Sequence, residues 1–171
     1  MRRRSLSFAF GLLFAAAACG GSSDSGTTAP NNSNQNPTAT NGTFTATING
    51  VAWGATGTVS VNHATAGLIT IAGFGLIGTS TGYSVALAIG NPTGPGTYSL
   101  SYLNSNTSQL IVGSGTGAGW TTFLNGGTGT LTITTLTSNH IVATFTADPV
   151  AASGGANGTI PVRNGKLDVT F

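Results

Sequence analysis

Apolar and small polar side chains alternate at every second residue, and no other feature of this sequence restricts the fold more. A period of two puts one set of side chains in a core and the other in water, which is typical of antiparallel strands. Asn49-Gly50 follows the first such segment and is a strong hairpin signal, after which Val51 and Trp53 begin the return strand. The clearest alternating segments are residues 43–48, 83–89, 130–134, 141–147 and 166–171.

Shorter segments with the same character fill the spaces between these strands, and clusters of Gly, Pro, Asn and Ser separate them. The pattern predicts about nine to eleven short strands between residues 42 and 171. That number of strands indicates an all-β fold, an antiparallel β-sandwich or a partly open barrel. The weaker strands are expected at residues 59–61, 68–74, 97–102, 110–113 and 121–124.

The N-terminus has the organisation of a lipoprotein signal peptide. Arg2 to Arg4 are followed by an apolar run at residues 6–18, too short for a membrane-spanning helix of roughly 20 residues. The run ends in Ala16-Ala17-Ala18-Cys19, which resembles a lipobox, where small residues precede a lipidated cysteine. This resemblance implies cleavage of residues 1–18 and acylation of Cys19. Ordinary signal-peptide cleavage after Ala18 is the alternative.

A polar linker separates the cysteine from the β domain. Residues 20–41 contain almost no apolar side chain larger than Ala, so they cannot bury enough surface to offset the entropy of ordering. We therefore expect residues 19–41 to be a lipidated, flexible tether and residues 42–171 to be one domain. Gly20 and Gly21 lack the Asp that retains enterobacterial lipoproteins in the inner membrane, so the resemblance favours the outer membrane of an exported, envelope-anchored protein.

Charge is scarce after cleavage. Charged residues make up 5% of the chain, against about 25% in an ordinary soluble domain. The predicted mature chain keeps two basic residues, Arg163 and Lys166, and three acidic ones, Asp24, Asp148 and Asp168, for a net charge of −1. No basic patch remains, which excludes nucleic acid as a partner.

Few residues can carry acid–base or metal chemistry. A glycosidase pair would require Asp148 with Asp168, and a metal site would require His63, His140 and Asp148 to converge. We interpret both histidines as loop residues and Asp168 as part of a solvated strand face. The single cysteine excludes an internal disulfide and a multi-cysteine zinc site. We therefore expect no catalytic residues, no metal and no cofactor.

Trp120 is the one aromatic side chain that stands apart as a candidate for ligand binding. It follows the glycine-rich stretch 113–119, and Asn104, Asn106 and Asn125 occur in nearby turns. An exposed Trp in such a place could stack on a sugar ring. The alternative is a Trp that closes one end of the sandwich, and the remaining aromatics alternate with small polar residues as core side chains do.

Four stretches of this sequence are distinctive: FTATINGVAW, GPGTYSLS, GTLTITTLTSNHIVATFTADP and NGKLDVTF. They resemble a group of uncharacterised bacterial lipoproteins whose mature domain opens with a Phe-x-Ala-x-Ile-Asn-Gly-x-x-Trp hairpin. The resemblance covers most of residues 43–171 and implies a lipoprotein with a β domain. It implies no activity and no functional residue.

The sequence as a whole predicts a lipid-anchored envelope protein whose β domain is a non-catalytic binding or structural module. The expected partners are the membrane, through acylated Cys19, and a glycan or another envelope protein. A carbohydrate-binding surface lipoprotein is the first alternative. An enzyme and a small outer-membrane barrel, prompted by Phe171, are less favoured, as is an ice- or mineral-binding surface built from Thr43/Thr45/Thr47, Thr130/Thr132/Thr134 and Thr144/Thr146.

Overall fold

The computed structural model describes residues 38–40, 42–63, 67–78, 81–101 and 108–171. The predicted signal peptide, Cys19 and residues 20–37 of the predicted tether lie outside this part of the chain. No helix within the described ranges is long and apolar enough to cross a membrane.

Thirteen strands are present in the described residues, and every strand pair is antiparallel. The predicted all-β antiparallel fold is therefore confirmed. The strands are β1 (Thr38–Thr40), β2 (Gly42–Ile48), β3 (Val51–Gly54), β4 (Val59–Asn62), β5 (Leu68–Ile77), β6 (Thr81–Gly90), β7 (Gly96–Ser99), β8 (Gln109–Ser114), β9 (Gly119–Thr121), β10 (Thr128–Leu136), β11 (His140–Asp148), β12 (Val150–Ser153) and β13 (Val162–Thr170).

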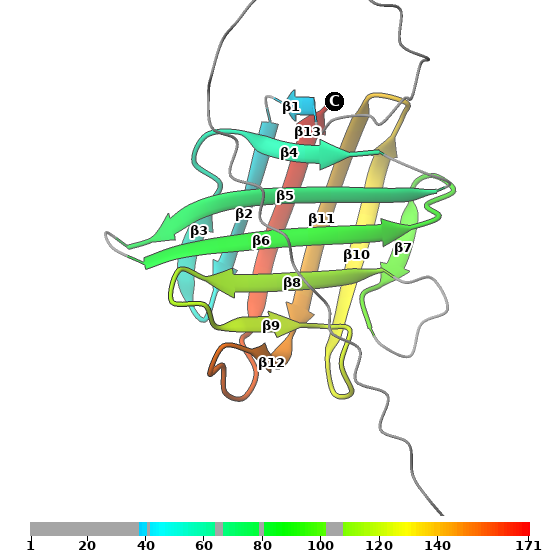
Figure 1. Cartoon of the computed structure of the whole chain (residues 1–171). Helices are drawn as coiled ribbons and strands as arrows, with labels where there is room; N and C mark the ends of the chain where they lie inside the picture. The colour runs from blue at the N-terminus through cyan, green and yellow to red at the C-terminus, as the bar shows by residue number, and fades with distance from the viewer. Residues whose placement is uncertain (1–37, 41, 64–66, 79–80, 102–107) are drawn as a thin grey trace, which may run out of the picture. The chain divides into compact units, whose positions relative to one another are not determined.

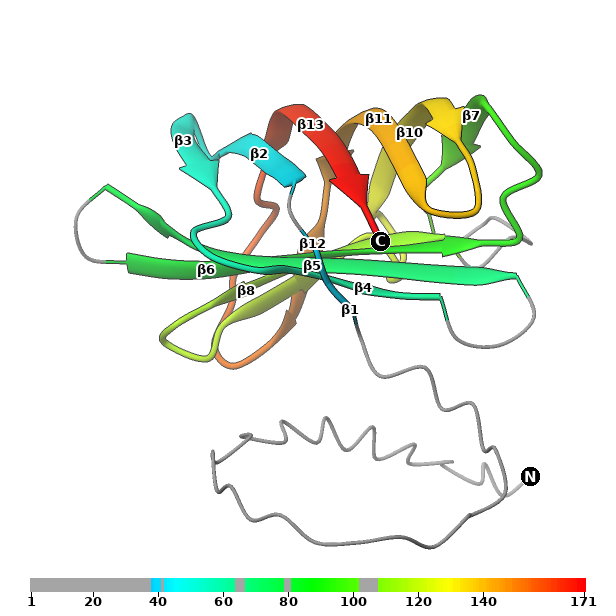
Figure 2. The ribbon, with the colours of Figure 1, turned by 90° about the horizontal axis from the view of Figure 1, so that it is seen from above.

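One hydrogen-bonded path joins these strands in the order β12-β9-β8-β6-β5-β3-β2-β13-β11-β10-β7, while β4 pairs with β5 and β1 with β4. The sheet changes direction between β3 and β5, where Trp53 and Ile77 are the only paired residues of the two strands. Two layers result (Figure 1): β4, β5, β6, β8 and β9 form one, and β2, β13, β11 and β10 cross behind them. Figure 2 shows the same layers edge-on.

The core lies between the two layers and is built from the apolar half of each alternating strand. Leu131 and Ile133 of β10 and Ile141 and Phe145 of β11 belong to this apolar half, and all four are buried. Phe44 links the aromatic side chains, because its ring centroid lies 5.3 Å from that of Trp53 and 5.7 Å from that of Phe145. These edge-on contacts are the favoured geometry for aromatic pairs and add to the free energy gained by burial.

Local turn chemistry agrees with the sequence at the first hairpin. Asn49 has φ 48° and Gly50 has φ 80°, so both central residues are left-handed. This geometry matches the right-handed twist of the flanking strands and explains why Asn-Gly occurs there. The predicted hairpin of β2 and β3 is confirmed, with Ile48 paired to Val51.

Three local predictions differ from the structure. Thr38–Thr40, inside the predicted tether, pair with Val59–Val61 as β1. The strand predicted at 121–124 is wrong, because β9 ends at Thr121 and the chain then turns. At the turn, the hydroxyl of the buried Thr122 accepts a 2.9 Å hydrogen bond from the Leu110 N–H. His140, predicted in a loop, begins β11.

Candidate functional site

A row of threonines crosses the outer surface of the layer formed by β2, β13, β11, β10 and β7. Thr97 pairs with Thr132, Thr132 with Thr144, Thr144 with Lys166, and Lys166 with Thr45. Neighbouring strands lie about 4.8 Å apart, so this row extends over about 19 Å. We call the following residues the Thr face: Thr45, Thr97, Thr130, Thr132, Thr144, Thr146, Asn164 and Lys166.

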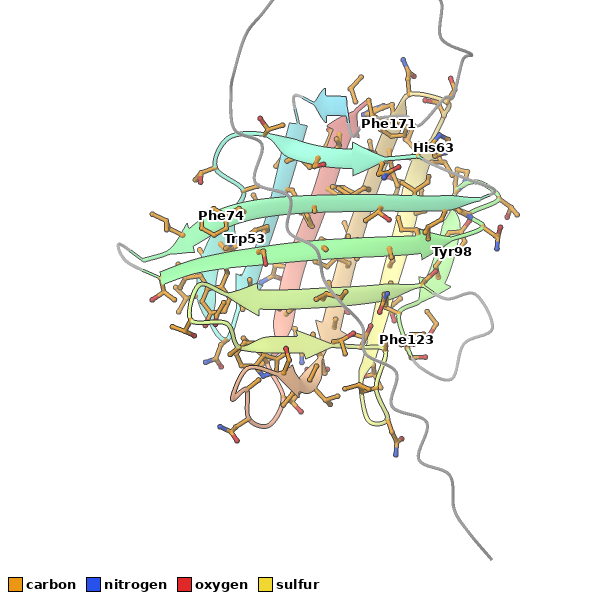
Figure 3. The ribbon with its side chains drawn as sticks, viewed as in Figure 1. Trp53, His63, Phe74, Tyr98, Phe123 and Phe171 are labelled. Carbon is orange, nitrogen blue, oxygen red and sulfur yellow. The ribbon has the colours of Figure 1, made fainter. Side chains whose placement is uncertain are left out.

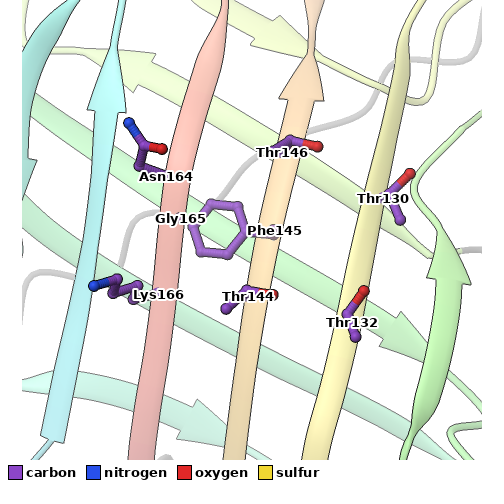
Figure 4. A pocket seen from close by; sticks show the side chains of 8 residues that line it. All are labelled: Thr130, Thr132, Thr144, Phe145, Thr146, Asn164, Gly165 and Lys166. Atoms are coloured by element: carbon purple, nitrogen blue, oxygen red, sulfur yellow. The ribbon is translucent and has the colours of Figure 1, made fainter.

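The middle of the Thr face is hollowed. A pocket of about 340 Å³ opens there between β10, β11 and β13 (Figure 4). Its polar side chains come from positions that alternate with core residues such as Leu131 and Leu167, so they point away from the core. The lining consists of Thr130, Thr132, Thr144, Phe145, Thr146, Asn164, Gly165 and Lys166.

An irregularity in β13 brings Asn164 to this pocket. The pairing of β13 shifts against β2 between Arg163 and Lys166, and the pairing of β11 with β13 shifts at the same level. Asn164 there has φ 51°, a left-handed conformation that Asn tolerates better than most residues. Arg163 and Asn164 are both exposed as a result, and β-bulges commonly re-aim side chains in this way.

Two contacts join ionisable side chains around the Thr face, and Lys166 takes part in neither. Arg163 Nη2 lies 2.6 Å from Asp148 Oδ1, and His140 Nε2 lies 2.8 Å from Asp168 Oδ1. Lys166 is exposed and has no ion-pair partner among the residues that the structure describes. The Thr face therefore presents one ammonium group within a field of neutral hydroxyls.

The chemistry available at the pocket is hydrogen bonding. Each threonine hydroxyl can donate one hydrogen bond and accept two, the Asn164 amide both donates and accepts, and the Lys166 ammonium donates three. Phe145, the aromatic residue of the lining, is 3% exposed and belongs to the core. Such a surface matches a ligand rich in hydroxyl groups, because its side chains can both donate hydrogen bonds to these groups and accept hydrogen bonds from them.

Trp120 lies elsewhere, in β9 on the other layer. It pairs with Val112 and Ala151, packs partly against the core, and donates its indole N–H to the Asn157 carbonyl over 3.3 Å. The surface that this ring offers to a ligand is therefore smaller than that of a Trp on an exposed loop. Asn104 and Asn106, expected near it, lie outside the described residues.

The ionisable residues considered for catalysis or metal binding fall into separate places. The ring of His63 lies 5.7 Å from that of Phe171 (Figure 3), whereas His140 contacts Asp168. Asp168 stands at the level of Val142 in β11, six residues from Asp148, which is about 20 Å along a strand. Glycosidase carboxylates stand about 5–9.5 Å apart. Within the described ranges, no three His, Cys, Asp or Glu side chains gather where they could hold a metal ion.

Apolar side chains are exposed on the other layer. Phe74 and Leu76 lie near one end of β5, Ile111 lies in β8, and Phe123 and Leu124 occupy the turn after β9. Figure 3 shows that Phe74 and Phe123 are well separated. These side chains are scattered singly or in pairs, and single exposed apolar residues are normal on soluble domains.

Alternation in the sequence identifies each threonine array separately, but it does not show that the arrays lie beside Asn164 and Lys166 on one surface. The available signal was Asn164-Gly165 directly before the alternating segment 166–171, since a glycine beside or within a strand pattern suggests a bulge.

No family model, no curated protein and no solved structure matches this chain. The structure itself establishes the all-β antiparallel fold of this chain.

Proposed function

We propose that this chain is a lipid-anchored protein of the bacterial envelope, and that its β domain is a non-catalytic module that binds a glycan on the Thr face. One observation carries the binding proposal. Threonine hydroxyls from two neighbouring strands surround one pocket and share it with Asn164 and Lys166. A sugar chain presents alternating hydroxyl donors and acceptors, which these side chains can satisfy together.

The anchoring part of the proposal rests on the N-terminal sequence. Export is supported by the three N-terminal arginines and the apolar run at 6–18. Cleavage and acylation are supported by the resemblance of Ala16-Ala17-Ala18-Cys19 to a lipobox. The resemblance to uncharacterised bacterial lipoproteins supports the same conclusion. Gly20 and Gly21 after the cysteine favour the outer membrane.

The non-catalytic part is supported by how the ionisable residues are placed. General acid–base catalysis needs a positioned proton donor or acceptor beside the reacting bond. The polar side chains that line the pocket are threonines, one amide and one lysine, whereas Asp148 contacts Arg163 and Asp168 contacts His140. We propose that the lysine among these hydroxyls recognises a ligand through hydrogen bonds and charge.

A second candidate function is adsorption to an ordered solid such as ice or a mineral. The cross-strand row from Thr97 to Thr45 favours it, since threonines of several strands stand side by side. Against it, the pairing shifts at Ile133/Thr135 and Arg163/Lys166 interrupt the regular spacing that such a surface needs. A flexible sugar chain tolerates this irregularity, and we therefore favour the glycan.

A glycan array probed with the full chain tests this proposal. The decisive variant is Thr132→Val/Thr144→Val, which removes two hydroxyls and keeps β-branched side chains of nearly the same size. Thr70→Val, on the outer surface of β5 in the other layer, is the matched control. We expect bound glycans for the natural chain and the control, and a loss of about tenfold or more for the double variant. An array without bound glycan, or equal binding by the double variant, would overturn the proposal.

A further inference from the structure

We infer that the glycan bound by the Thr face carries anionic groups and that Lys166 is the residue that selects them. This inference rests on the proposed function and names the class of ligand for the same site. The anion is a carboxylate, sulfate or phosphate attached to the sugar chain, since all three can accept hydrogen bonds from an ammonium group.

The position of Lys166 is the first support. It stands inside the cross-strand row, with Thr144 as its partner on one side and Thr45 on the other, and it lines the pocket. A ligand that occupies the pocket therefore covers the lysine together with the threonines. A lysine at the rim of the domain would not be covered in this way.

The surrounding charges are the second support. Asp168 points to the same outer face two residues further along β13, and its carboxylate is held by His140. Asp148 is held by Arg163, whose guanidinium also donates to the carbonyls of Ala147 and Val162. Lys166 belongs to neither of these pairs, and it is the one charged side chain among the residues that line the pocket.

Burial of that charge by a ligand has a predictable consequence. A neutral sugar would displace water from the ammonium group and return only hydroxyl acceptors, whereas an anionic sugar returns an opposite charge and a charge-assisted hydrogen bond. Lys166 therefore discriminates against neutral chains, and the threonines supply the contacts that all sugar chains share. Lys166 acts as a specificity-determining residue among the neutral side chains of the Thr face.

The test is an array that carries neutral glycans beside glycans with uronic carboxylates, sulfate esters and phosphate esters, probed with the full chain and with its Lys166→Gln and Lys166→Arg variants. We expect the natural chain to prefer anionic glycans. Lys166→Gln should lower that binding by about tenfold, and Lys166→Arg should retain it because the charge is kept. Raising the ionic strength from 0.15 M to 0.5 M should weaken binding by the natural chain more than by Lys166→Gln.

The outcomes separate this inference from the proposed function. Bound glycans that are all neutral, or equal binding by Lys166→Gln and the natural chain, would overturn the inference and leave glycan binding standing. Absence of any bound glycan would overturn both. Comparison of the carboxylate, sulfate and phosphate arms identifies which anion the site takes, and a preference for any one of them supports the inference.

Discussion

The phenyl ring of Phe145 lies directly over Gly165 in the neighbouring strand. The two residues are cross-strand partners in β11 and β13, and a Cβ atom placed on Gly165 would stand 2.5 Å from three carbons of the ring. The ring therefore fills the space that the missing side chain leaves. Figure 4 shows this pair between the threonines of β11 and the side chains of Asn164 and Lys166, so the same contact joins the core to the pocket.

The first prediction concerns the ring itself. Phe145→Ala should lower the free energy of unfolding by about 3–5 kcal/mol, because the ring is 3% exposed and its loss leaves a cavity. Total stabilities are about 5–15 kcal/mol, so the variant is expected to be close to unfolding. Urea denaturation followed by circular dichroism measures the change. Phe74→Ala, whose ring is 54% exposed, is the control and should cost far less. Equal losses would contradict the assignment of Phe145 to the core.

The second prediction concerns its partner. Gly165→Ala should destabilise the domain by about 1–3 kcal/mol, since the new methyl group overlaps the ring and the packed core cannot give way freely. In a Phe145→Ala background the same change should cost clearly less, because the clash is gone. A double-mutant cycle from denaturation curves measures this coupling. Strictly additive losses would show that the two residues do not restrict each other.

The third prediction is that Cys19 anchors the protein. Mass spectrometry of the N-terminus should find an acylated cysteine as the first residue, and Cys19→Ala should move the protein from the membrane fraction to the soluble fraction. Several acyl chains bind a membrane far more strongly than one, so the separation should be nearly complete. An unmodified cysteine at the mature N-terminus, or a Cys19→Ala protein that stays with the membrane, would exclude lipidation.

The fourth prediction separates the tether from β1. Deletion of residues 20–37 should leave the melting temperature unchanged, because that stretch is made almost entirely of polar and small side chains. Extension of the deletion through Thr40 should lower it, since the three β1 residues pair with Val59–Val61. Thermal denaturation of both variants measures the difference. A large decrease from the shorter deletion would show that the tether packs on the domain.

Most of the fold could be predicted because the alternating segments are long. The alternating residues 83–89 and 141–147 lie within β6 and β11, where buried and more exposed side chains alternate over most of each strand. The sequence did not reveal β1 and β12, which have three and four residues, and it placed the three-residue β9 too far along the chain. Segments of that length contain too few residues for a reliable period. β12 pairs with β9 after the chain passes Pro149 at the end of β11, which is a tertiary effect.

The Thr face could be predicted only in pieces. Alternation shows that Thr130, Thr132, Thr144 and Thr146 point away from the core, but their grouping with Lys166 depends on strand order. The last strand, β13, lies between β2 and β11, and this long-range pairing has no local signal. The left-handed Asn164 follows from the same pairing shift. The glycines that precede Trp120 favour an exposed loop, whereas strand pairing places its ring partly against the core.

The central claim is that the Thr face is where the ligand binds, and a nuclear magnetic resonance titration tests it most directly. Labelled protein is titrated with the glycan that gives the strongest array signal. The account predicts that the largest chemical-shift changes fall on the amide signals of Thr130, Thr132, Thr144 and Lys166 and on the methyl signals of the three threonines. Changes centred on Trp120, or on the exposed apolar side chains of the other layer, would contradict it.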